Sequence, residues 1–223
     1  MSSILITLVL SGVFCGLYLL VARRLRILDT PNDRSSHESP TPHGGGVGLM
    51  LALVVGVCLA TPDTGGWPPQ YLLLLAAAIA LMLLGVVDDL KSLPVRLRFT
   101  LYAFICLVTA SLLLAPQAIA GPTTLALVGV AALAMLWSLN LYNFMDGIDG
   151  IAAIQCLSAC SAAALMSWNN EASNAYVLFC LLLAASHGGF LLWNFPPARL
   201  FMGDAGSVPT GFLVAGLALL GAV

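Results

Sequence analysis

The sequence predicts an all-α, polytopic integral membrane protein: a helical bundle with about eight transmembrane helices. Three observations support this fold class. Of the 223 residues, 60% are hydrophobic and only 8% are charged, and the mean hydropathy of +1.01 is far above that of a soluble domain. Apolar runs of about 18 residues recur along the chain, and each can cross the hydrocarbon core as a helix. Because backbone polar groups cannot go unpaired in lipid, we expect helices throughout.

The predicted helices follow one another in a regular series and account for most of the chain. The second is short, and we expect it to begin within the glycines at 44–46. The chain shows no soluble domain, so residues 1–223 are expected to form a single membrane-embedded domain. The predicted spans are 4–22, 47–61, 70–87, 97–115, 123–139, 151–167, 175–193 and 208–223.

Charged residues are concentrated between the apolar runs. Sixteen of the eighteen fall within residues 23–46, 88–98, 140–150 and 194–207. Successive helices reverse direction, so all four stretches should lie on one side of the membrane. All eight Lys and Arg residues lie in these stretches, and the positive-inside rule therefore predicts that this side is cytoplasmic.

Composition also argues against several other classes. The net charge of −2 includes no basic run of the kind that binds nucleic acid. All six cysteines lie within apolar spans, where they are interpreted as small buried hydrophobic residues and not as redox or metal-binding groups. Arg23, Arg24 and Arg26 follow the first apolar run, which favours a true first helix over a cleaved signal peptide.

Asp88 and Asp89 close the third span in the segment LLGVVDDLKS. Negative charge is disfavoured at the C-terminal end of a helix, and adjacent carboxylates at a membrane boundary are costly without a cation. This pair therefore indicates function more than structure, although a role at the helix end is the alternative.

The segment from Asn140 to Gly150 carries two amides and two carboxylates within eleven residues. Asn140 and Asn143 are three residues apart and should share a helix face. Asp146 and Asp149 are each followed by glycine, which permits tight turns. We expect a polar pocket that can hold hydrated Mg²⁺ and a polar ligand. Asp149 could instead cap the sixth helix.

The remaining two stretches have similar chemistry. In the fourth, Arg199 can face a phosphate, Phe201 offers an aromatic surface, and Asp204 sits where a carboxylate can approach a metal. The alternative is a loop in which Asp204 or Ser207 caps the eighth helix. In the first, Gly44–Gly46 could form an anion cradle of backbone N–H groups, or could allow close helix packing.

Taken together, the four stretches resemble the polyprenyl-phosphate N-acetylhexosamine-1-phosphate transferases, also called glycosyltransferase family 4. The matching segments are DTPNDRSSH with PTPHGGG, the Asp88-Asp89 pair, NLYNFMDGIDG and FMGDAGS. They occur in the order and membrane spacing of that family, across essentially the whole chain. The Ser-Ser-His version in the first segment is more similar to the O-antigen-initiating branch than to the peptidoglycan branch.

The resemblance implies a reaction at the inner membrane of a bacterium, with the active site on its cytoplasmic face. A polyprenyl phosphate, such as undecaprenyl phosphate, attacks the β-phosphate of a UDP-N-acetylhexosamine, giving a polyprenyl-diphospho-sugar and UMP. Mg²⁺ is the implied cofactor, with Asp204 and Asp88 at the metal. The implied catalytic residues are Asp88, Asp89, Asp146 and Asp149. The implied substrate-binding residues are His37, Asn143, Asn194 and Phe201, with Phe201 stacking on uracil. Asn140 and Arg199 join the predicted substrate-binding set from their own stretches, Asn140 beside Asn143 and Arg199 as a residue that can face a phosphate.

The resemblance has one departure. The family carries a histidine-rich cytoplasmic loop beyond the eighth span, and nothing before Val223 matches it. We therefore expect a fragment that lacks the C-terminal helices of the family, and an inactive truncated module is an alternative. A transporter with acidic residues is the other alternative, but it predicts acids at mid-span. The sugar stays open among N-acetylglucosamine, N-acetylgalactosamine and 6-deoxy N-acetylhexosamines.

Overall fold

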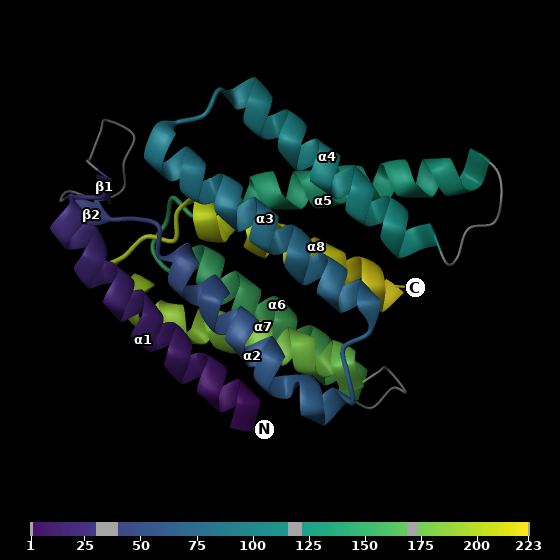
Figure 1. The fold of residues 1–223 in the computed structure, drawn as a ribbon, viewed down its shortest axis with the longest axis horizontal. Helices are drawn as coiled ribbons and strands as arrows, with labels where there is room; N and C mark the ends of the chain where they lie inside the picture. Colours follow the sequence, from purple (N-terminus) through teal and green to yellow (C-terminus); the bar gives the residue numbers. More distant parts are fainter. Residues whose placement is uncertain (1, 30–39, 116–121, 169–173, 223) are drawn as a thin grey trace.

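The structure, a computed structural model, describes residues 2–29, 40–115, 122–168 and 174–222. The described residues form eight helices and one two-stranded sheet (Figure 1). This confirms the predicted all-α bundle. The elements are α1 (Ser2–Leu25), β1 (Leu28–Asp29), β2 (Thr41–Pro42), α2 (Gly46–Thr64), α3 (Pro69–Lys91), α4 (Val95–Leu114), α5 (Pro122–Met145), α6 (Ile151–Trp168), α7 (Asn174–Asn194) and α8 (Asp204–Ala222).

Seven of these helices are long and apolar enough to cross a membrane. The exception is α2, whose apolar part, Gly46–Thr61, is shorter and begins at the glycines as predicted. Large hydrophobic side chains such as Leu125, Trp137 and Leu165 are more than 70% exposed on the outside of the bundle. Lipid is the environment that suits such a surface, and the chain is a multi-pass membrane protein.

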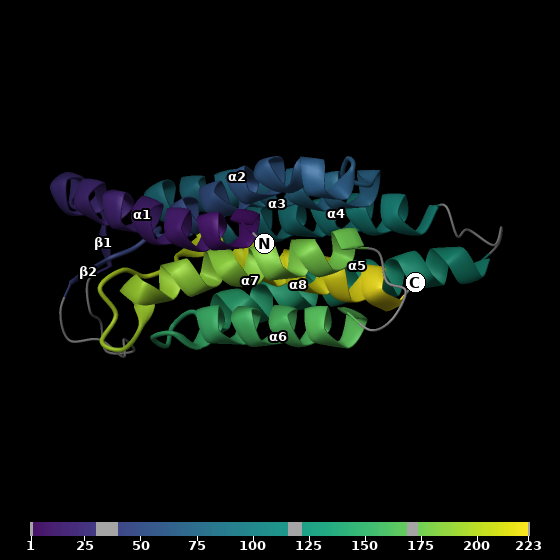
Figure 2. The ribbon, with the colours of Figure 1, turned by 90° about the horizontal axis from the view of Figure 1, so that it is seen from below.

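The helices form two groups that meet along α8 and α2. In one group, α1, α2 and α6 pack around α7; in the other, α3 and α5 pack against α8, and α4 packs against α5. Figure 2 shows α7 running between α1 and α6. Contacts between α2 and α8 connect the two groups. Helices of both groups therefore contact α8, α2 from the first group and α3 from the second.

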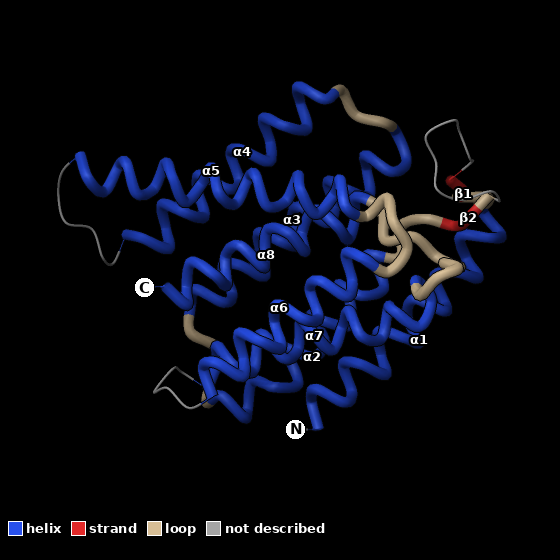
Figure 3. Tube along the Cα trace, turned by 180° about the vertical axis from the view of Figure 1, so that it is seen from behind, coloured by secondary structure: helices blue, strands red, loops and turns tan. Residues whose placement is uncertain are grey.

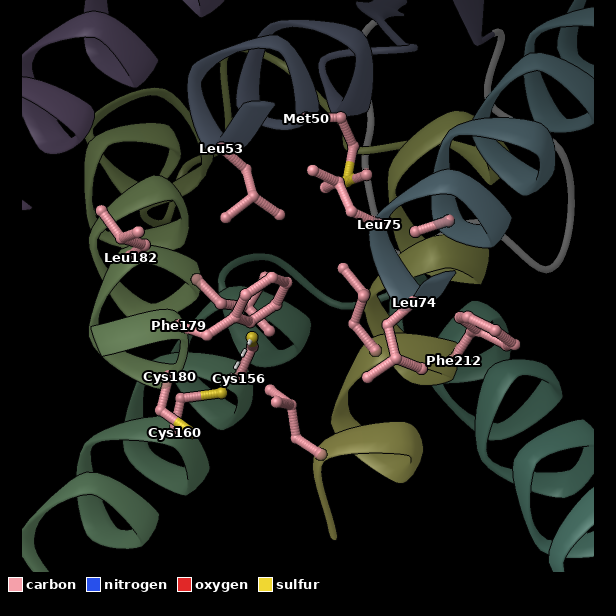
Figure 4. Close-up of a cluster of buried hydrophobic side chains, with 14 of the residues drawn as sticks. Met50, Leu53, Leu74, Leu75, Cys156, Cys160, Phe179, Cys180, Leu182 and Phe212 are labelled. Carbon is pink, nitrogen blue, oxygen red and sulfur yellow. Dashed lines mark hydrogen bonds between the residues drawn. The ribbon is translucent and has the colours of Figure 1, made fainter. Parts of the chain in front are cut away.

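The buried core contains apolar side chains from both groups (Figure 4). Phe179 of α7, Leu53 of α2, Leu74 of α3 and Phe212 of α8 are each fully buried. All six cysteines are free, and five of them are buried, as predicted for small hydrophobic residues. Cys58 differs, because its side chain is exposed on α2.

Two glycines allow the first turn of α8 to lie against neighbouring helices. A Cβ on Gly46 would lie 2.2 Å from the Cα of Gly206, and a Cβ on Gly85 would lie 2.5 Å from the carbonyl carbon of Asp204. Only glycine permits so close an approach. Gly46 N–H donates to the carbonyl of Met202 at 2.8 Å. These contacts favour the close-packing interpretation of the glycine triplet over an anion cradle.

A short sheet, absent from the sequence-based prediction, joins the chain on either side of residues 30–39. Leu28 of β1 pairs with Pro42 of β2 in antiparallel register. Strands of two residues show no alternating pattern, so hydropathy could not have revealed them. Phe201 N–H donates to the carbonyl of Pro42 at 2.8 Å, and thus ties the segment before α8 to this sheet.

Candidate active site

The connections that follow α1, α3, α5 and α7 gather at one end of the bundle (Figures 1 and 3). These connections and the helix ends beside them hold the described parts of all four charged stretches, so the predicted convergence is confirmed. The described acidic residues of these stretches lie at helix ends or in the connections and the short sheet, not at mid-span. This placement disfavours the transporter alternative, which requires acids at mid-span.

A guanidinium joins two of the carboxylates. Arg98, in the first turn of α4, donates from Nη1 to Oδ2 of Asp88 at the end of α3. The same Nη1 lies 3.0 Å from Oδ2 of Asp204, at the start of α8. The second oxygen of Asp88 accepts a hydrogen bond from Leu93 N–H at 2.8 Å. Asp88 is buried, and its negative charge is balanced by Arg98.

The other oxygen of Asp204 is held by α5. Asn143 Nδ2 donates to Oδ1 of Asp204 at 2.5 Å and lies 3.0 Å from Oγ of Ser207. Ser207 in turn donates to the carbonyl of Gly203 at 3.0 Å. Both oxygens of Asp204 therefore have a partner, and their positions depend on helices α4 and α5.

Asp89 has a different environment from its neighbour Asp88. Its two oxygens accept hydrogen bonds from the N–H groups of Asp204 and Ala205, at 3.1 and 3.3 Å. These are the first N–H groups of α8, which lack partners within the helix and favour negative charge. Nδ1 of His43 lies 3.9 Å from Oδ1 of Asp89. Asp89 therefore caps the N-terminus of α8. The alternative interpretation of the sequence had given this role to Asp204 or Ser207. The catalytic role of Asp89 stays a prediction.

Asp146 lies next to this group on the connection after α5. Its Oδ2 accepts a hydrogen bond from Gly203 N–H at 3.0 Å, and Gly203 has a φ of 71° that favours glycine. Burial raises the pKa of the Asp146 carboxyl well above its ordinary value. The carboxylates of Asp204 and Asp89 raise this pKa further, whereas the Gly203 N–H lowers it. The negative charge of Asp146 is thus less favoured here than on an exposed carboxylate.

Hydrogen bonds of Asp149 and Asn194 join the connection after α5 to the connection before α8. Oδ2 of Asp149 accepts a hydrogen bond from Ala198 N–H at 2.8 Å, so this carboxylate links two loops. Oδ1 of Asn194 accepts from Gly150 N–H at 3.0 Å, and its Nδ2 donates to the carbonyl of Leu200 at 3.0 Å. Asn194 is buried, and its amide stabilises the shape of the loop.

The other predicted site residues lie apart from this network or cannot be placed. Asn140 is exposed and donates to the carbonyl of Leu136, so the contacts of Asn143 are not shared by Asn140. Arg199 is exposed and lies over the ring of Trp193. Phe201 is partly buried, and its carbonyl accepts from Gly45 N–H at 2.9 Å. His37 lies outside the described residues.

Three residues of the network were missing from the predicted site residues: Arg98, Ser207 and His43. Ser207 had been considered only as a helix cap. Arg98 was visible as a basic residue ten positions after Asp88, in the same charged stretch. The cost of two acids at a membrane boundary called for a cation, but the sequence offered Lys91, Arg96 and Arg98 equally. Only the direction in which α4 leaves the loop distinguishes them.

The donor set fits Mg²⁺. Asp88 and Asp204 both contact one cationic nitrogen, so the two carboxylates lie close together, and they are the residues that would hold the ion. Within residues 2–29, 40–115, 122–168 and 174–222, no group of three or more His, Cys, Asp or Glu side chains is arranged to hold a metal. Mg²⁺ needs no such cage, because it commonly binds one or two carboxylates and completes its shell with water and substrate phosphates.

Comparison with known proteins identifies the relatives of this chain. Residues 71–222 match the family described as glycosyl transferase family 4. A phospho-N-acetylmuramoyl-pentapeptide-transferase of Geobacillus kaustophilus is 31% identical over 98% of this chain and 72% of its own length. A probable undecaprenyl-phosphate N-acetylglucosaminyl 1-phosphate transferase of Bacillus subtilis is 27% identical over 90% of this chain.

A third relative, an undecaprenyl-phosphate α-N-acetylglucosaminyl 1-phosphate transferase of Yersinia pestis, is 31% identical over 90% of the chain. The chain spans 57% of the length of the Bacillus protein and 58% of the Yersinia protein. The relatives thus include proteins named for a muramoyl-pentapeptide and proteins named for N-acetylglucosamine.

Proposed function

Because the chain belongs to glycosyl transferase family 4, we propose that it carries the active centre of a transferase that moves N-acetylhexosamine 1-phosphate from a UDP-sugar to a polyprenyl phosphate. A phosphate oxygen of the lipid attacks the β-phosphorus of the UDP-sugar. The bond between that phosphorus and the bridging oxygen breaks, and UMP leaves. The observation that carries the proposal is the network of Asp88, Arg98, Asp204 and Asn143 at one end of the membrane helices.

Phosphoryl transfer depends on positioning and on neutralising the charge of the transferred group. Asp204 and Asp88 are the residues that would hold Mg²⁺, and the ion would supply positive charge to the diphosphate. Asn143 fixes Oδ1 of Asp204 by a hydrogen bond of 2.5 Å and so orients the carboxylate. Arg98 keeps the two carboxylates together and offers further N–H donors to a phosphate.

Asp88 is the residue to which we assign the lipid phosphate. It lies at the end of α3, where a membrane-embedded lipid can present its headgroup to the polar end of the bundle. Its carboxylate can orient that phosphate or take its remaining proton. Asp89 and Asp146 have other contacts: Asp89 accepts from Ala205 N–H in the first turn of α8, and Asp146 accepts from the N–H of Gly203, the residue before that helix.

We place the nucleotide beside the segment before α8. The resemblance assigns uridine to Asn194 and Phe201, and the partly exposed ring of Phe201 can stack on a base. Asn194 is 2% exposed and bonded on both sides, so it supports this site by shaping the loop. His37 stays a proposed substrate contact through the resemblance, and Asn140 and Arg199 stay so through their places in the charged stretches.

We further propose an O-antigen or related cell-envelope polysaccharide initiator at the bacterial inner membrane, with its active site facing the cytoplasm. The Ser-Ser-His segment favours this branch, and the positive-inside rule favours this orientation. Peptidoglycan synthesis is the competing assignment, because the relatives include muramoyl-pentapeptide transferases. A panel of UDP-N-acetylglucosamine, UDP-N-acetylgalactosamine and UDP-N-acetylmuramoyl-pentapeptide separates the branches.

UMP release is the decisive test. Membranes that contain the protein should release UMP only when a UDP-N-acetylhexosamine, a polyprenyl phosphate and Mg²⁺ are all present. Parallel assays of this chain and of a longer form that adds the C-terminal helices would identify an inactive truncated module, since only the longer form would then react. Absence of UMP release from both folded forms with every donor would refute the proposed transferase.

A further inference from the structure

A groove of about 520 Å³ opens on the outside of the bundle, along the last two turns of α7. Leu192 and Phe195 are 62% and 63% exposed along it. Gly188, Leu191, Leu192 and Phe195 have the three- and four-residue spacing of one helix face. The groove is lined by Gly188, Leu191, Leu192, Phe195, Pro196 and Arg199.

All residues that line the groove belong to α7 or to the segment after it, and α1 and α6 pack on either side of α7 (Figure 2). A Cβ built on Gly188 would lie 3.4 Å from Leu157 of α6 and 3.7 Å from Leu8 of α1. Gly188, one of the lining residues, therefore has a leucine of each neighbouring helix at ordinary contact distance, so a larger side chain here would occupy space in or beside the groove. From Gly188 to Phe195 the groove extends about 10 Å along the helix axis, toward the polar end of the bundle.

The guanidinium of Arg199 lies at the end of the groove nearest the polar end of the bundle, and two contacts hold it in place. The guanidinium carbon of Arg199 lies 5.2 Å from the ring centre of Trp193, and its Nη2 donates to the carbonyl of Leu192 at 3.1 Å. Trp193 is itself held by a hydrogen bond from Nε1 to the carbonyl of Gly12 in α1. Among the described residues, Arg199 makes no ion pair, and its other guanidinium N–H groups can bind an anion.

We propose that this groove binds one phospholipid of the surrounding bilayer that has an anionic headgroup. An apolar groove along the end of α7, next to an arginine that has no ion pair among the described residues, complements a hydrocarbon chain joined to a phosphate. Basic pockets between membrane helices bind such headgroups. A guanidinium suits a phosphodiester because its N–H groups can bind two oxygens at once. The proposal does not rest on the transferase reaction.

The site is distinct from the network around Asp204. Among the described residues, no hydrogen bond or ion pair joins the Arg199 side chain to Asp88, Asp146 or Asp204. Arg199 packs against the outer surface of α7, whereas that network lies on α3, α4, α5 and α8. A lipid held here would brace the loop whose Ala198 N–H binds Asp149.

Lipid binding to the purified 223-residue chain tests the proposal. Phosphatidylglycerol and phosphatidylcholine of identical chains are titrated, and retained lipid is counted by native mass spectrometry together with the shift in the thermal unfolding midpoint. We expect phosphatidylglycerol to bind about fivefold more tightly, the contribution of one basic residue near an anionic surface. Equal binding of the two lipids would refute the proposal without any variant.

Two variants locate the site. Arg199→Gln should abolish the preference for phosphatidylglycerol, whereas Arg96→Gln, an equal charge change at an exposed position of α4, should preserve it. Gly188→Leu should place a side chain in the groove and weaken binding of both lipids. Retention of the preference by Arg199→Gln, or unchanged binding to Gly188→Leu, would contradict the assignment.

Two further ligands distinguish the sources of the phosphate. Glycerol phosphate alone should not stabilise the protein, because it lacks the hydrocarbon chain that the apolar groove binds. Stabilisation by glycerol phosphate would indicate a simple anion site instead. Polyprenyl phosphate should not displace phosphatidylglycerol at equal concentration. One-for-one displacement would identify the groove as a path for the lipid substrate and would overturn the choice of a bilayer phospholipid.

Discussion

Nη1 of Arg98 lies 3.0 Å from Oδ2 of Asp204, across 106 positions of sequence, and the same nitrogen contacts Asp88. One guanidinium therefore joins the ends of α3, α4 and α8 at the site. A cation bound by the same carboxylates would compete with this guanidinium or share them with it. The stability of the site and its response to Mg²⁺ should thus depend on Arg98.

Arg98→Met should destabilise the protein and increase its response to Mg²⁺, because Asp88 and Asp204 would lose their positive partner. The Arg98 side chain is 29% exposed, so we expect a cost of about 1–2 kcal/mol, less than for a fully buried pair. Thermal unfolding with and without Mg²⁺ measures both effects. Arg96→Met, an exposed position on the same helix, is the control. Equal behaviour of the two variants would contradict the role assigned to Arg98.

Asp204→Asn should abolish turnover while leaving membrane insertion intact. The substitution removes a charged oxygen ligand with little change of volume, and we expect a loss of at least about 10²-fold in kcat. UMP release from a full-length form, normalised to protein in the membrane, is the measurement. If Asp204→Asn kept near-normal activity and Mg²⁺ dependence, Asp204 could not be the principal ligand.

Asp88→Asn and Asp89→Asn should have different effects, although the residues are adjacent. Asp88→Asn should lower kcat and kcat/KM together, by about 10²-fold, with little change in KM for the UDP-sugar. Asp89→Asn should instead destabilise the start of α8 by about 1 kcal/mol, because it weakens a helix cap. Kinetics and thermal unfolding of both purified variants separate these outcomes. Unchanged turnover of folded Asp88→Asn would remove that residue from the mechanism.

Asn143→Ala should impair turnover far more than Asn140→Ala. Asn143 holds Oδ1 of Asp204, whereas Asn140 is exposed and bonds only within its own helix among the contacts described. Loss of an orienting hydrogen bond to a charged group is worth about 1.5–3 kcal/mol, or roughly 10- to 100-fold in rate. Side-by-side UMP assays test the difference, and equal losses would count against the geometry.

Gly85→Ala should displace the first turn of α8 and lower activity. The added Cβ would lie 2.5 Å from the carbonyl of Asp204, a distance that the backbone must relieve by moving. Gly129→Ala, on α5, is the control because a Cβ there meets nothing within 4 Å. Activity and Mg²⁺ dependence of both variants are measured. Normal activity of Gly85→Ala would show that α3 does not fix the position of Asp204.

The proposed orientation can be tested by cysteine labelling in a cysteine-free background. Cysteines placed at Arg24, Lys91 and Arg199 should react with a membrane-impermeant thiol reagent only from the cytoplasmic side, and one at Gly65 only from the outside. The predicted outward residue Asn170 lies outside the described residues and serves as a second outer position. Labelling of position 65 only from the cytoplasm would reverse the orientation.

Hydropathy and charge placement were sufficient to predict the eight helices and the common end at which the charged stretches meet. Both depend on quantities that are local in sequence: the length of an apolar run and the alternation of direction between successive helices. The same local information identified Asp88, Asn143, Asp146 and Asp204 as site candidates, and the structure brings all four to that end.

Only the tertiary structure separated residues that look equivalent in the sequence. Adjacent residues of a helix point about 100° apart, so Asp88 meets Arg98 while Asp89 caps α8. Asn143 faces α8, whereas Asn140 is exposed, and Arg199 turns outward to Trp193. Such partners depend on the rotation and close packing of whole helices, here set by Gly46 and Gly85 against α8. A local pattern identifies polar residues at a helix end, but the packing of distant helices decides which of them meet.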